Sequence, residues 1–264
     1  MKILYIGDIV AKIGRRAVSQ VLPDLKIEKQ IDFVIAQSEN MSTGNGVTPK
    51  SIREMQDAGV DFFTGGNHSF KKREGVELMS DPKSNIIRPA NYPGNTPGRG
   101  WQIAETPFGN ILVINVLGQT FNGPQLDHPL KVIDGILEET KDEKLSAAIV
   151  DFHGDLSSEK VAIGFYLDGK VSGVVGSHIH VSTADARVLP GGTAHISDVG
   201  MTGPIDSVLG VKKEIIIERW LNQLPNKFDW PTTGIVQFSS VLIDVGKDGK
   251  AKSIEQILRQ VDVN

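Results

Sequence analysis

Short apolar runs, each followed by turn residues, alternate with amphipathic stretches along the first two thirds of the chain. Runs of this kind predict buried strands, whereas apolar positions spaced three and four apart predict helices. In residues 14–29, for example, Val18, Val21, Leu22 and Leu25 form one apolar stripe. A regular alternation of strands and helices favours an α/β fold.

The predicted elements of this part are bounded by the ends of the apolar patterns. The strands are 2–7, 32–38, 60–64, 101–106, 111–116, 147–152 and 171–176. The helices are 14–29, 48–58, 71–80, 130–143 and 157–167. The second helix carries the clearest start signal, because Thr48 can cap it and Pro49 suits its first position.

The last third of the chain has a different pattern, with more strand than helix. It contains a predicted strand at 194–197, a helix at 212–222, and two strands at 235–245 and 252–260. The turn Lys247-Asp-Gly-Lys250 between the last two strands is typical of a type I′ hairpin. No repeat or linker divides the sequence, so we expect one mixed α/β domain over residues 1–264.

The composition limits the class of protein. Hydrophobic residues make up 39 % and charged residues 23 %, as in a soluble globular protein. No apolar run approaches the ~20 residues of a membrane span, and the absence of cysteine excludes disulfides and thiolate metal sites. We therefore expect a cytoplasmic protein without a membrane partner. The net charge of −4 argues against a broad electrostatic grip on nucleic acid, but it permits a phosphate substrate held by divalent cations.

Five of the predicted strands end in residue types that can bind metals. In an open α/β sheet, ligands bind just outside the carboxyl ends of the strands. If these strands share a sheet, their ends bring acids, amides and four of the six histidines together, which is the donor set of a metal site. The candidates are Asp8, Glu39, Asn40, Asn67, His68, His153, His178 and His180.

Two of the candidates are separated by one residue in Gly176-Ser-His178-Ile-His180. In a regular strand the two rings would point to opposite faces. Both can therefore reach one site only if the backbone turns after Gly176. The alternative is a pair of surface histidines in a loop.

The segment Gly65-Gly66-Asn67-His68 also follows a predicted strand. Adjacent glycines allow a close approach to the backbone. Asn67 can then offer its amide oxygen to a metal, while His68 points elsewhere and is free for proton transfer. The alternative is a glycine turn with Asn67 at positive φ.

The remaining candidates each have a structural alternative. Asp8 could cap the first helix, Glu39 and Asn40 could be solvated loop residues, and His153 could be a buried histidine without a ligand role. Because all of them share the position after a strand, a common site is favoured. The other two histidines fall outside this pattern, at positions 128 and 195.

Taken in order, these motifs resemble those of the calcineurin-like metallophosphoesterases: Gly-Asp, a bridging acid, Gly-Asn-His, a lone His and Gly-His-x-His. There are two departures. Val10 stands where the first motif has histidine, and Glu39-Asn40 replaces the usual Gly-Asp. With the segments 88–93, 164–169 and 197–204, these departures resemble the bacterial YmdB-like phosphodiesterases over nearly the whole chain.

The resemblance implies a sandwich of two mixed β-sheets flanked by helices, in four αββα layers. It also implies two divalent metal ions, Fe or Mn first and Zn or Mg as alternatives, ~3.5–4 Å apart and bridged by Glu39. The implied ligands of one ion are Asp8, Asn40 and His180, with Asn40 filling the place of the missing histidine. Those of the other ion are Asn67, His153 and His178.

The implied activity is hydrolysis of cyclic nucleotides, 2′,3′-cyclic and also 3′,5′-cyclic, through attack by a metal-bridging hydroxide. His68 would donate a proton to the leaving ribose oxygen. The alternatives are a phosphomonoesterase or nucleotidase on the same site, and a regulator that binds a nucleotide or RNA without catalysis. The expected partner is a cyclic nucleotide or another small phosphodiester. RNA is a further candidate that the net charge of −4 does not support, and assembly into a homo-oligomer stays open. We expect the loops 41–47, 117–126 and 198–209 to shape the pocket.

Overall fold

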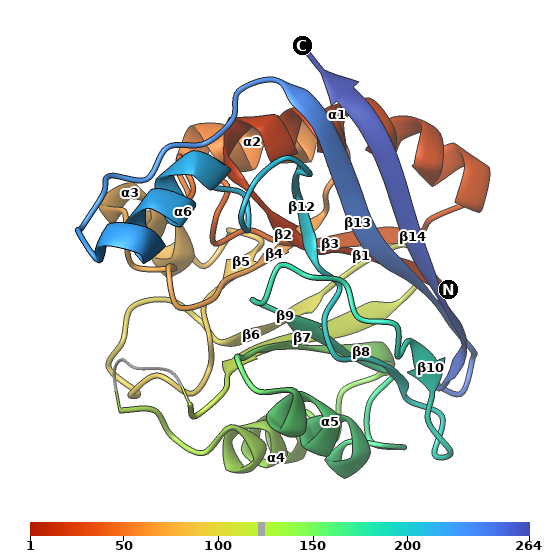
Figure 1. Cartoon of the computed structure of the whole chain (residues 1–264). Helices are drawn as coiled ribbons and strands as arrows, with labels where there is room; N and C mark the ends of the chain where they lie inside the picture. Colours follow the sequence, from red (N-terminus) through yellow and green to blue (C-terminus); the bar gives the residue numbers. More distant parts are fainter. Residues whose placement is uncertain (121–124) are drawn as a thin grey trace.

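The computed structural model describes residues 1–120 and 125–264 and contains two β-sheets packed face to face (Figure 1). In chain order, the strands are β1 (Lys2–Ile6), β2 (Asp8–Ile9), β3 (Phe33–Gln37), β4 (Phe62–Thr64), β5 (Ile86–Ile87), β6 (Trp101–Ala104), β7 (Asn110–Leu117), β8 (Leu145–His153), β9 (Gly173–Ser177), β10 (Arg187–Val188), β11 (Ala194–Ile196), β12 (Met201–Pro204), β13 (Gly234–Val245) and β14 (Ala251–Val263). The helices are α1 (Ala11–Lys29), α2 (Pro49–Asp57), α3 (Arg73–Ser80), α4 (Pro129–Glu139), α5 (Ser157–Tyr166) and α6 (Lys213–Asn222).

Both sheets are mixed, as expected. The first has the order β2-β12-β13-β1-β3-β4-β5, with β14 paired to β13. Its strands β1, β3, β4 and β5 are parallel, whereas β13 runs antiparallel to β1. The second sheet has the order β10-β11-β9-β8-β7-β6, and its central strands β7, β8, β9 and β11 are parallel.

Alternation along the strands builds the layers. In β1, Ile3 and Tyr5 belong to the apolar cluster between the two sheets, whereas Leu4 and Ile6 belong to the cluster beneath α1, α2 and α3. A third cluster joins the outer face of the second sheet to α4 and α5. The predicted four-layer αββα sandwich is therefore confirmed (Figure 1).

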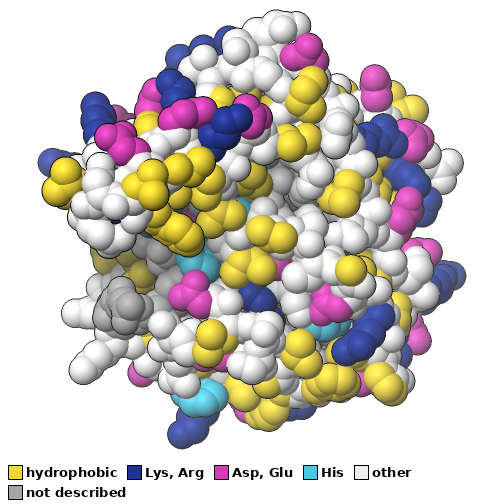
Figure 2. All heavy atoms as spheres, viewed as in Figure 1, with side chains coloured by type: hydrophobic (Ala, Val, Ile, Leu, Met, Phe, Trp, Pro, Cys, Tyr) yellow, Lys and Arg dark blue, Asp and Glu magenta, His cyan; other side chains and the backbone are white. Residues whose placement is uncertain are grey.

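One helix stands outside these layers. No residue of α6 is buried, and Trp220 and Leu221 on it are 79 % and 83 % exposed. Figure 2 shows a group of hydrophobic side chains over this helix, beside the hollow in which histidine and acidic side chains are visible. Among the described residues, no helix is both long and apolar enough to cross a membrane.

The start of α2 follows the sequence prediction. Thr48 is the N-cap, its hydroxyl accepts a hydrogen bond from the Ser51 amide, and Pro49 takes the first helical position. The Ser51 hydroxyl completes a capping box with the Thr48 backbone. This end of the loop 41–47 is thereby fixed.

The predicted type I′ hairpin is wrong. A type I′ turn needs positive φ at both central residues, but of Asp248 and Gly249 only Gly249 has it, at 76°. The Gly249 amide donates to the Gly246 carbonyl, so the turn is centred on Lys247 and Asp248, and a register shift follows at Asp244/Val245. A left-handed glycine after such a turn forms a bulge, which a two-residue hairpin lacks.

Four strands were not predicted, and three of them have only two residues. These are β2, β5 and β10, and two residues give no readable alternation. The fourth, β12, runs through the expected loop 198–209, where Gly200 and Gly203 interrupt the apolar pattern. The expected loop 117–126 includes residues 121–124, which lie outside the described residues.

Candidate metal centre

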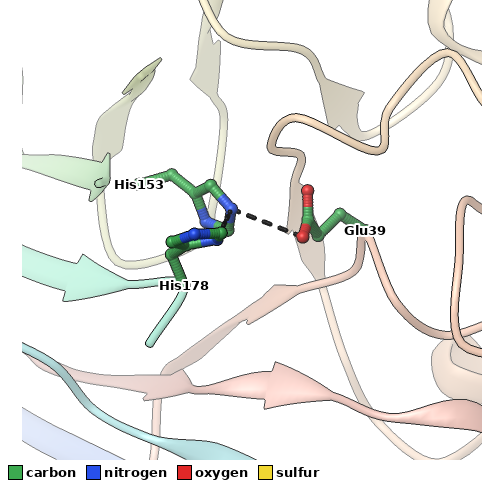
Figure 3. A group of neighbouring side chains, drawn as sticks. All are labelled: Glu39, His153 and His178. Atoms are coloured by element: carbon green, nitrogen blue, oxygen red, sulfur yellow. Dashed lines mark hydrogen bonds and ion pairs between the residues drawn. The ribbon is translucent and has the colours of Figure 1, made fainter. Parts of the chain in front are cut away.

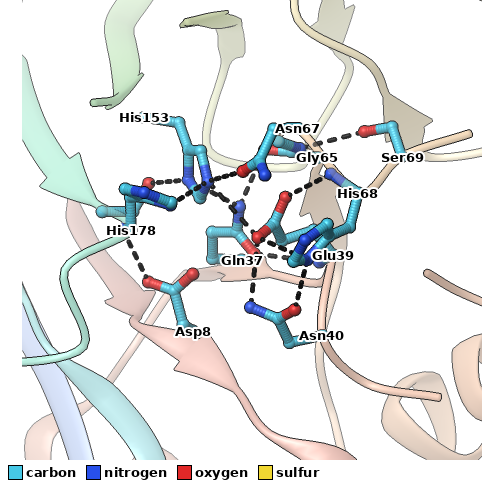
Figure 4. Close-up of polar contacts among 12 residues, drawn as sticks. Asp8, Gln37, Glu39, Asn40, Gly65, Asn67, His68, Ser69, His153 and His178 are labelled. Atoms are coloured by element: carbon cyan, nitrogen blue, oxygen red, sulfur yellow. Dashed lines mark hydrogen bonds and ion pairs between the residues drawn. The ribbon is translucent and has the colours of Figure 1, made fainter. Parts of the chain in front are cut away.

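All eight candidate residues meet where the carboxyl ends of strands from both sheets face each other, and all of them except His180 are labelled in Figure 4. Asp8 follows β1, Glu39 and Asn40 follow β3, and Asn67 and His68 follow β4. His153 ends β8, and the segment 178–180 directly follows β9. The group therefore exists only because the two sheets dock on each other.

Glu39 lies at the middle of the group and is 1 % exposed. Its Oε1 is 3.3 Å from both His153 Nε2 and His68 Nδ1, and its Oε2 accepts the His68 backbone N–H at 2.8 Å. Burial acts to raise the pKa of Glu39, but His153 and His68 outweigh it and hold that pKa well below the usual range. Glu39 is thus a buried anion, and the alternative of a solvated loop residue is wrong.

His153 and His178 complete a compact group with Glu39 (Figure 3). One ligand atom from each lies within 4.8 Å of the other two. Burial opposes charge on His153, yet Glu39 raises its pKa to about 9. Burial and the charge of His153 lower the pKa of His178 to about 4. Glu39 therefore favours a positive charge on His153, and that charge disfavours a second one on His178.

Asp8 tests whether the group suits a cation. It is fully buried, and its Oδ1 has no hydrogen-bond partner among the described residues, while its Oδ2 accepts the His178 N–H at 3.1 Å. A buried carboxylate oxygen without a partner is costly, and a cation would supply that partner. Because the donors are carboxylates, amides and imidazoles, they fit the borderline metals Fe, Mn and Zn. Asp8 does not cap α1, whose N-cap is Val10.

The two implied ligand sets differ in how closely they converge. In one set, Asn67 Oδ1 and His178 Nδ1 lie 3.0 and 3.1 Å from His153 Nε2. In the other, His180 Nε2 is 3.7 Å from Asp8 Oδ1. Asn40 turns its amide nitrogen to His180 and its oxygen to His68, so its amide would have to rotate to present oxygen to a metal.

The backbone turns after Gly176, as both histidines require. His178 and His180 have φ of 101° and 62°, a region that non-glycine residues seldom occupy. A Cβ at position 176 would lie 1.7 Å from the Ser197 carbonyl oxygen, so only glycine fits there. His178 and His180 do lie in a loop, as the alternative supposed. They are not surface histidines, however, because both rings point into the group.

Glycine is also required beside Asn67. A Cβ at Gly66 would lie 2.2 Å from Glu39 Oε2 and 2.6 Å from His153 Nε2. The glycine pair predicted that another group lies close to this backbone. In the structure, that group consists of the Glu39 and His153 side chains. Asn67 is not among the described residues with positive φ, so the simple glycine-turn alternative is wrong.

His68 differs from the other rings because it lies at the opening of the group. Its side chain is 29 % exposed, and its Nδ1 donates to Asn40 Oδ1 at 2.8 Å. Its Nε2 has no hydrogen-bond partner among the described residues, which leaves that atom free to meet a bound molecule. This arrangement suits proton transfer at the edge of the site.

The matched family model is described as YmdB-like protein and spans residues 4–257. The chain belongs to this family. A Bacillus subtilis (strain 168) relative, named 2′,3′-cyclic-nucleotide 2′-phosphodiesterase, is 42 % identical over 98 % of this chain and 97 % of its own.

Two solved structures have the same fold. One, described as a hypothetical protein from Thermus thermophilus, has a TM-score of 0.91 and 37 % identity over 98 % of this chain and 99 % of that one. The other, described as a novel phosphatase from Mycoplasma pneumoniae, has a TM-score of 0.91 and 31 % identity over 100 % of this chain and 94 % of that one. The fold is that of the metallophosphoesterases, and the family implies divalent metal ions at this centre.

The sequence did not reveal the residues that hold the YmdB-like centre in place. Ser177 Oγ donates to Asp151 Oδ1 at 2.7 Å and lies 2.8 Å from His153 Nδ1, so the His153 Nδ1–H points to Ser177 and Nε2 faces Glu39. Burial raises the pKa of Asp151 to about 6. Such partners fix the orientation of a metal-binding ring.

A buried ion pair supports the backbone of the two histidines. Lys160 Nζ donates to both Asp198 Oδ2 and the Ser177 carbonyl oxygen at 2.6 Å. The same Asp198 oxygen accepts the Ile179 N–H at 3.2 Å. Of these supporting residues, only Asp198 lies in a segment whose sequence resembles the family, namely 197–204. His128 is exposed at the start of α4 and His195 is buried in β11, so both lie outside the site.

Proposed function

We propose that this YmdB-like protein is a metal-dependent phosphodiesterase that hydrolyses 2′,3′-cyclic nucleotides, and also 3′,5′-cyclic ones, at the Glu39 group. The observation that carries the proposal is the buried pair of acids Glu39 and Asp8, in which Asp8 Oδ1 has no hydrogen-bond partner among the described residues. The cluster around them opens to solvent beside His68, whose side chain is partly exposed. The name of the Bacillus subtilis relative supports the substrate class.

The proposed ligands are those expected from the sequence. Glu39 would touch two ions, of which one is also held by Asp8, Asn40 and His180. Asn67, His153 and His178 would hold the other. Bound divalent ions supply a Lewis acid and lower the pKa of a water molecule, which is the chemistry of two-metal hydrolases.

The protein's own groups would position the substrate and move the proton. Asn40 Oδ1 accepts the His68 Nδ1–H, and Glu39 Oε1 lies 3.3 Å from the same nitrogen, so Glu39 would keep its contact with His68 when the Asn40 amide rotates toward a metal. The Nε2 atom of His68 would then face the substrate, where it would donate a proton to the ribose oxygen that leaves phosphorus. Both of these contacts are made through Nδ1, so a substrate can approach Nε2 directly.

The decisive experiment compares substrates on the purified protein loaded with Mn²⁺ or Fe²⁺. We expect turnover of 2′,3′-cyclic nucleotides to exceed that of a phosphomonoester dye. The description of the Mycoplasma pneumoniae structure as a phosphatase makes a phosphomonoesterase the second candidate. Faster turnover of the monoester would favour it, and stoichiometric nucleotide binding without turnover by metal-loaded protein would favour the non-catalytic regulator.

Several finer points stay predictions. The metal is expected to be Fe or Mn, with Zn or Mg as alternatives. We infer one domain over residues 1–264, because strands from both ends of the chain share the first sheet. The cytoplasmic location stays a prediction from the sequence, and assembly into a homo-oligomer stays open.

A further inference from the structure

A large cavity lies beside the metal centre. It is open to solvent, measures about 940 Å³ and is lined mainly by the start of α1, the loop 42–48 and the segment 226–232 after α6. Its wall begins directly after the metal-centre residues, because Ala11 and Ser42 follow Asp8 and Asn40 by three and two positions. The Ala11 N–H also donates to the Asn40 carbonyl oxygen at 2.9 Å. A molecule bound at the centre could therefore extend into this cavity.

The lining carries an excess of positive charge in a chain whose net charge is −4. Four cations in it form no salt bridge with any described residue, namely Lys12, Lys72, Arg219 and Lys227. A fifth, Arg15, is paired with Glu54. The only acid among the described lining residues is Asp229, which pairs with Lys212. Unpaired cations around a hollow indicate an anionic ligand.

Two aromatic side chains share the lining with these cations. Trp230 is half-buried, and its ring packs on the loop backbone so closely that a Cβ at Gly44 would lie 2.0 Å from it. Phe228 lies 5.4 Å from the Arg219 guanidinium. Aromatic faces for bases, combined with cations for phosphates, are how proteins bind single-stranded nucleic acid.

The backbone of the lining is strained in two places. Ala11 and Thr43 have φ of 53° and 49°, and such values are rare for residues with a Cβ, most of all for a β-branched one. Strain of this kind is concentrated at functional sites. The two histidines of the metal centre, His178 and His180, share this feature.

We propose that this cavity binds the last nucleotides of a single-stranded RNA whose 2′,3′-cyclic phosphate end lies in the metal centre. A cyclic mononucleotide has one phosphate, which is too few to neutralise the four cations that form no salt bridge. In the reaction, a water oxygen bonds to phosphorus, the bond from phosphorus to the ribose 2′ oxygen breaks, and that oxygen takes a proton. The strand then ends in a 3′-phosphate. Only the placement of the cyclic end rests on the proposed function.

Binding is tested separately from turnover, with metal-loaded full-length protein and a fluorescent hexaribonucleotide that ends in a 3′-hydroxyl. We expect K72A/K227A to weaken binding at least tenfold. The slope of log K against log salt should fall by about 1.4, because each phosphate contact on a single strand contributes about 0.7 to that slope. W230L should weaken binding roughly tenfold. The control K131A/K144A removes the same charge from exposed positions elsewhere, and K72R/K227R should restore binding.

Equal loss of affinity in the two alanine pairs, or loss in neither, would overturn the cavity as the RNA site. If the wild type opens 2′,3′-cyclic AMP but binds the strand independently of Lys72, Lys227 and Trp230, this inference fails and the proposed function stands. If binding depends on these residues but no cyclic end is opened, the proposed function fails and the cavity remains an RNA site.

Discussion

At the scale of single residues, the rings of the centre have separate tasks because their surroundings differ. His153 is fully buried and is held between Glu39 on one side and Ser177 on the other. His68 is partly exposed and contacts Asn40 through one nitrogen only. A buried, doubly held ring suits a ligand, and an open ring suits proton transfer.

His68→Ala should therefore keep the bound metal but lose most of the turnover. General acid catalysis contributes roughly 10²–10⁴ in rate, so kcat should fall by about that factor. Elemental analysis and steady-state kinetics on the same sample test this, with the exposed His128→Ala as the control. Near-normal turnover in His68→Ala would exclude the proton-donor role.

Ser177→Ala should weaken metal binding, although it removes none of the proposed ligands. It removes the acceptor of the His153 Nδ1–H and the donor to Asp151. Loss of such a partner typically costs about 10–100-fold in metal affinity, which competition with a chromogenic chelator measures. Ser172→Ala, a buried serine of the same sheet region away from His153, is the matched control. Equal affinity in the two variants would show that Ser177 does not orient the ring.

At the scale of elements, the segment after β9 depends on a charge pair beneath it. Lys160 of α5 and Asp198 before β12 are 1 % and 0 % exposed in their side chains. Between them they bind the backbone at Ser177 and Ile179 and so hold two left-handed histidines in place.

Lys160→Met should destabilise the protein by about 3–5 kcal/mol, because it leaves the Asp198 charge buried without its partner. The double variant K160M/D198L removes both charges and should recover much of that loss. Urea denaturation of the three proteins measures the difference. A double variant less stable than Lys160→Met would mean that the backbone contacts of Asp198 outweigh its charge.

The sequence was sufficient to place the candidate residues but not their supports. Each candidate ends or directly follows an apolar run that was long enough to be recognised as a strand. The position of each candidate could therefore be predicted from its own segment of the sequence. The strands β2, β5 and β10 are too short for such a signal. Lys160 and Asp198 are 38 positions apart, and neither shows in its own segment that the other lies beside it. The type I′ turn failed for a similar reason, since the bulge is set by pairing over the whole length of β13 and β14.

At the scale of the whole molecule, metal binding should stabilise the docking of the two sheets. The first sheet supplies Asp8, Glu39 and Asn67, and the second supplies His153 and His178. A ligand at 100 times its Kd adds about 2.7 kcal/mol, which is roughly 5–10 °C in Tm for a chain of this size.

Removal of metal with a chelator should therefore lower the Tm of the wild-type protein by roughly that amount. Glu39→Ala removes the proposed bridge and should bind little metal, so its Tm should respond weakly to the same chelator. Differential scanning calorimetry with and without added Mn²⁺ gives both values. A full response in Glu39→Ala, or two metals per chain in it, would show that Glu39 is not the bridge.

The position of β13 in the first sheet has a consequence for synthesis of the chain. This strand lies between β12 and β1, yet it is made of residues 234–245, near the end of the sequence. All eight candidate residues have left the ribosome before the strand that joins β1 to β12 is made. The sheet beneath Asp8 cannot close until then, and we expect metal to be taken up only after β13 has been made, whatever the order in which the ligands are translated.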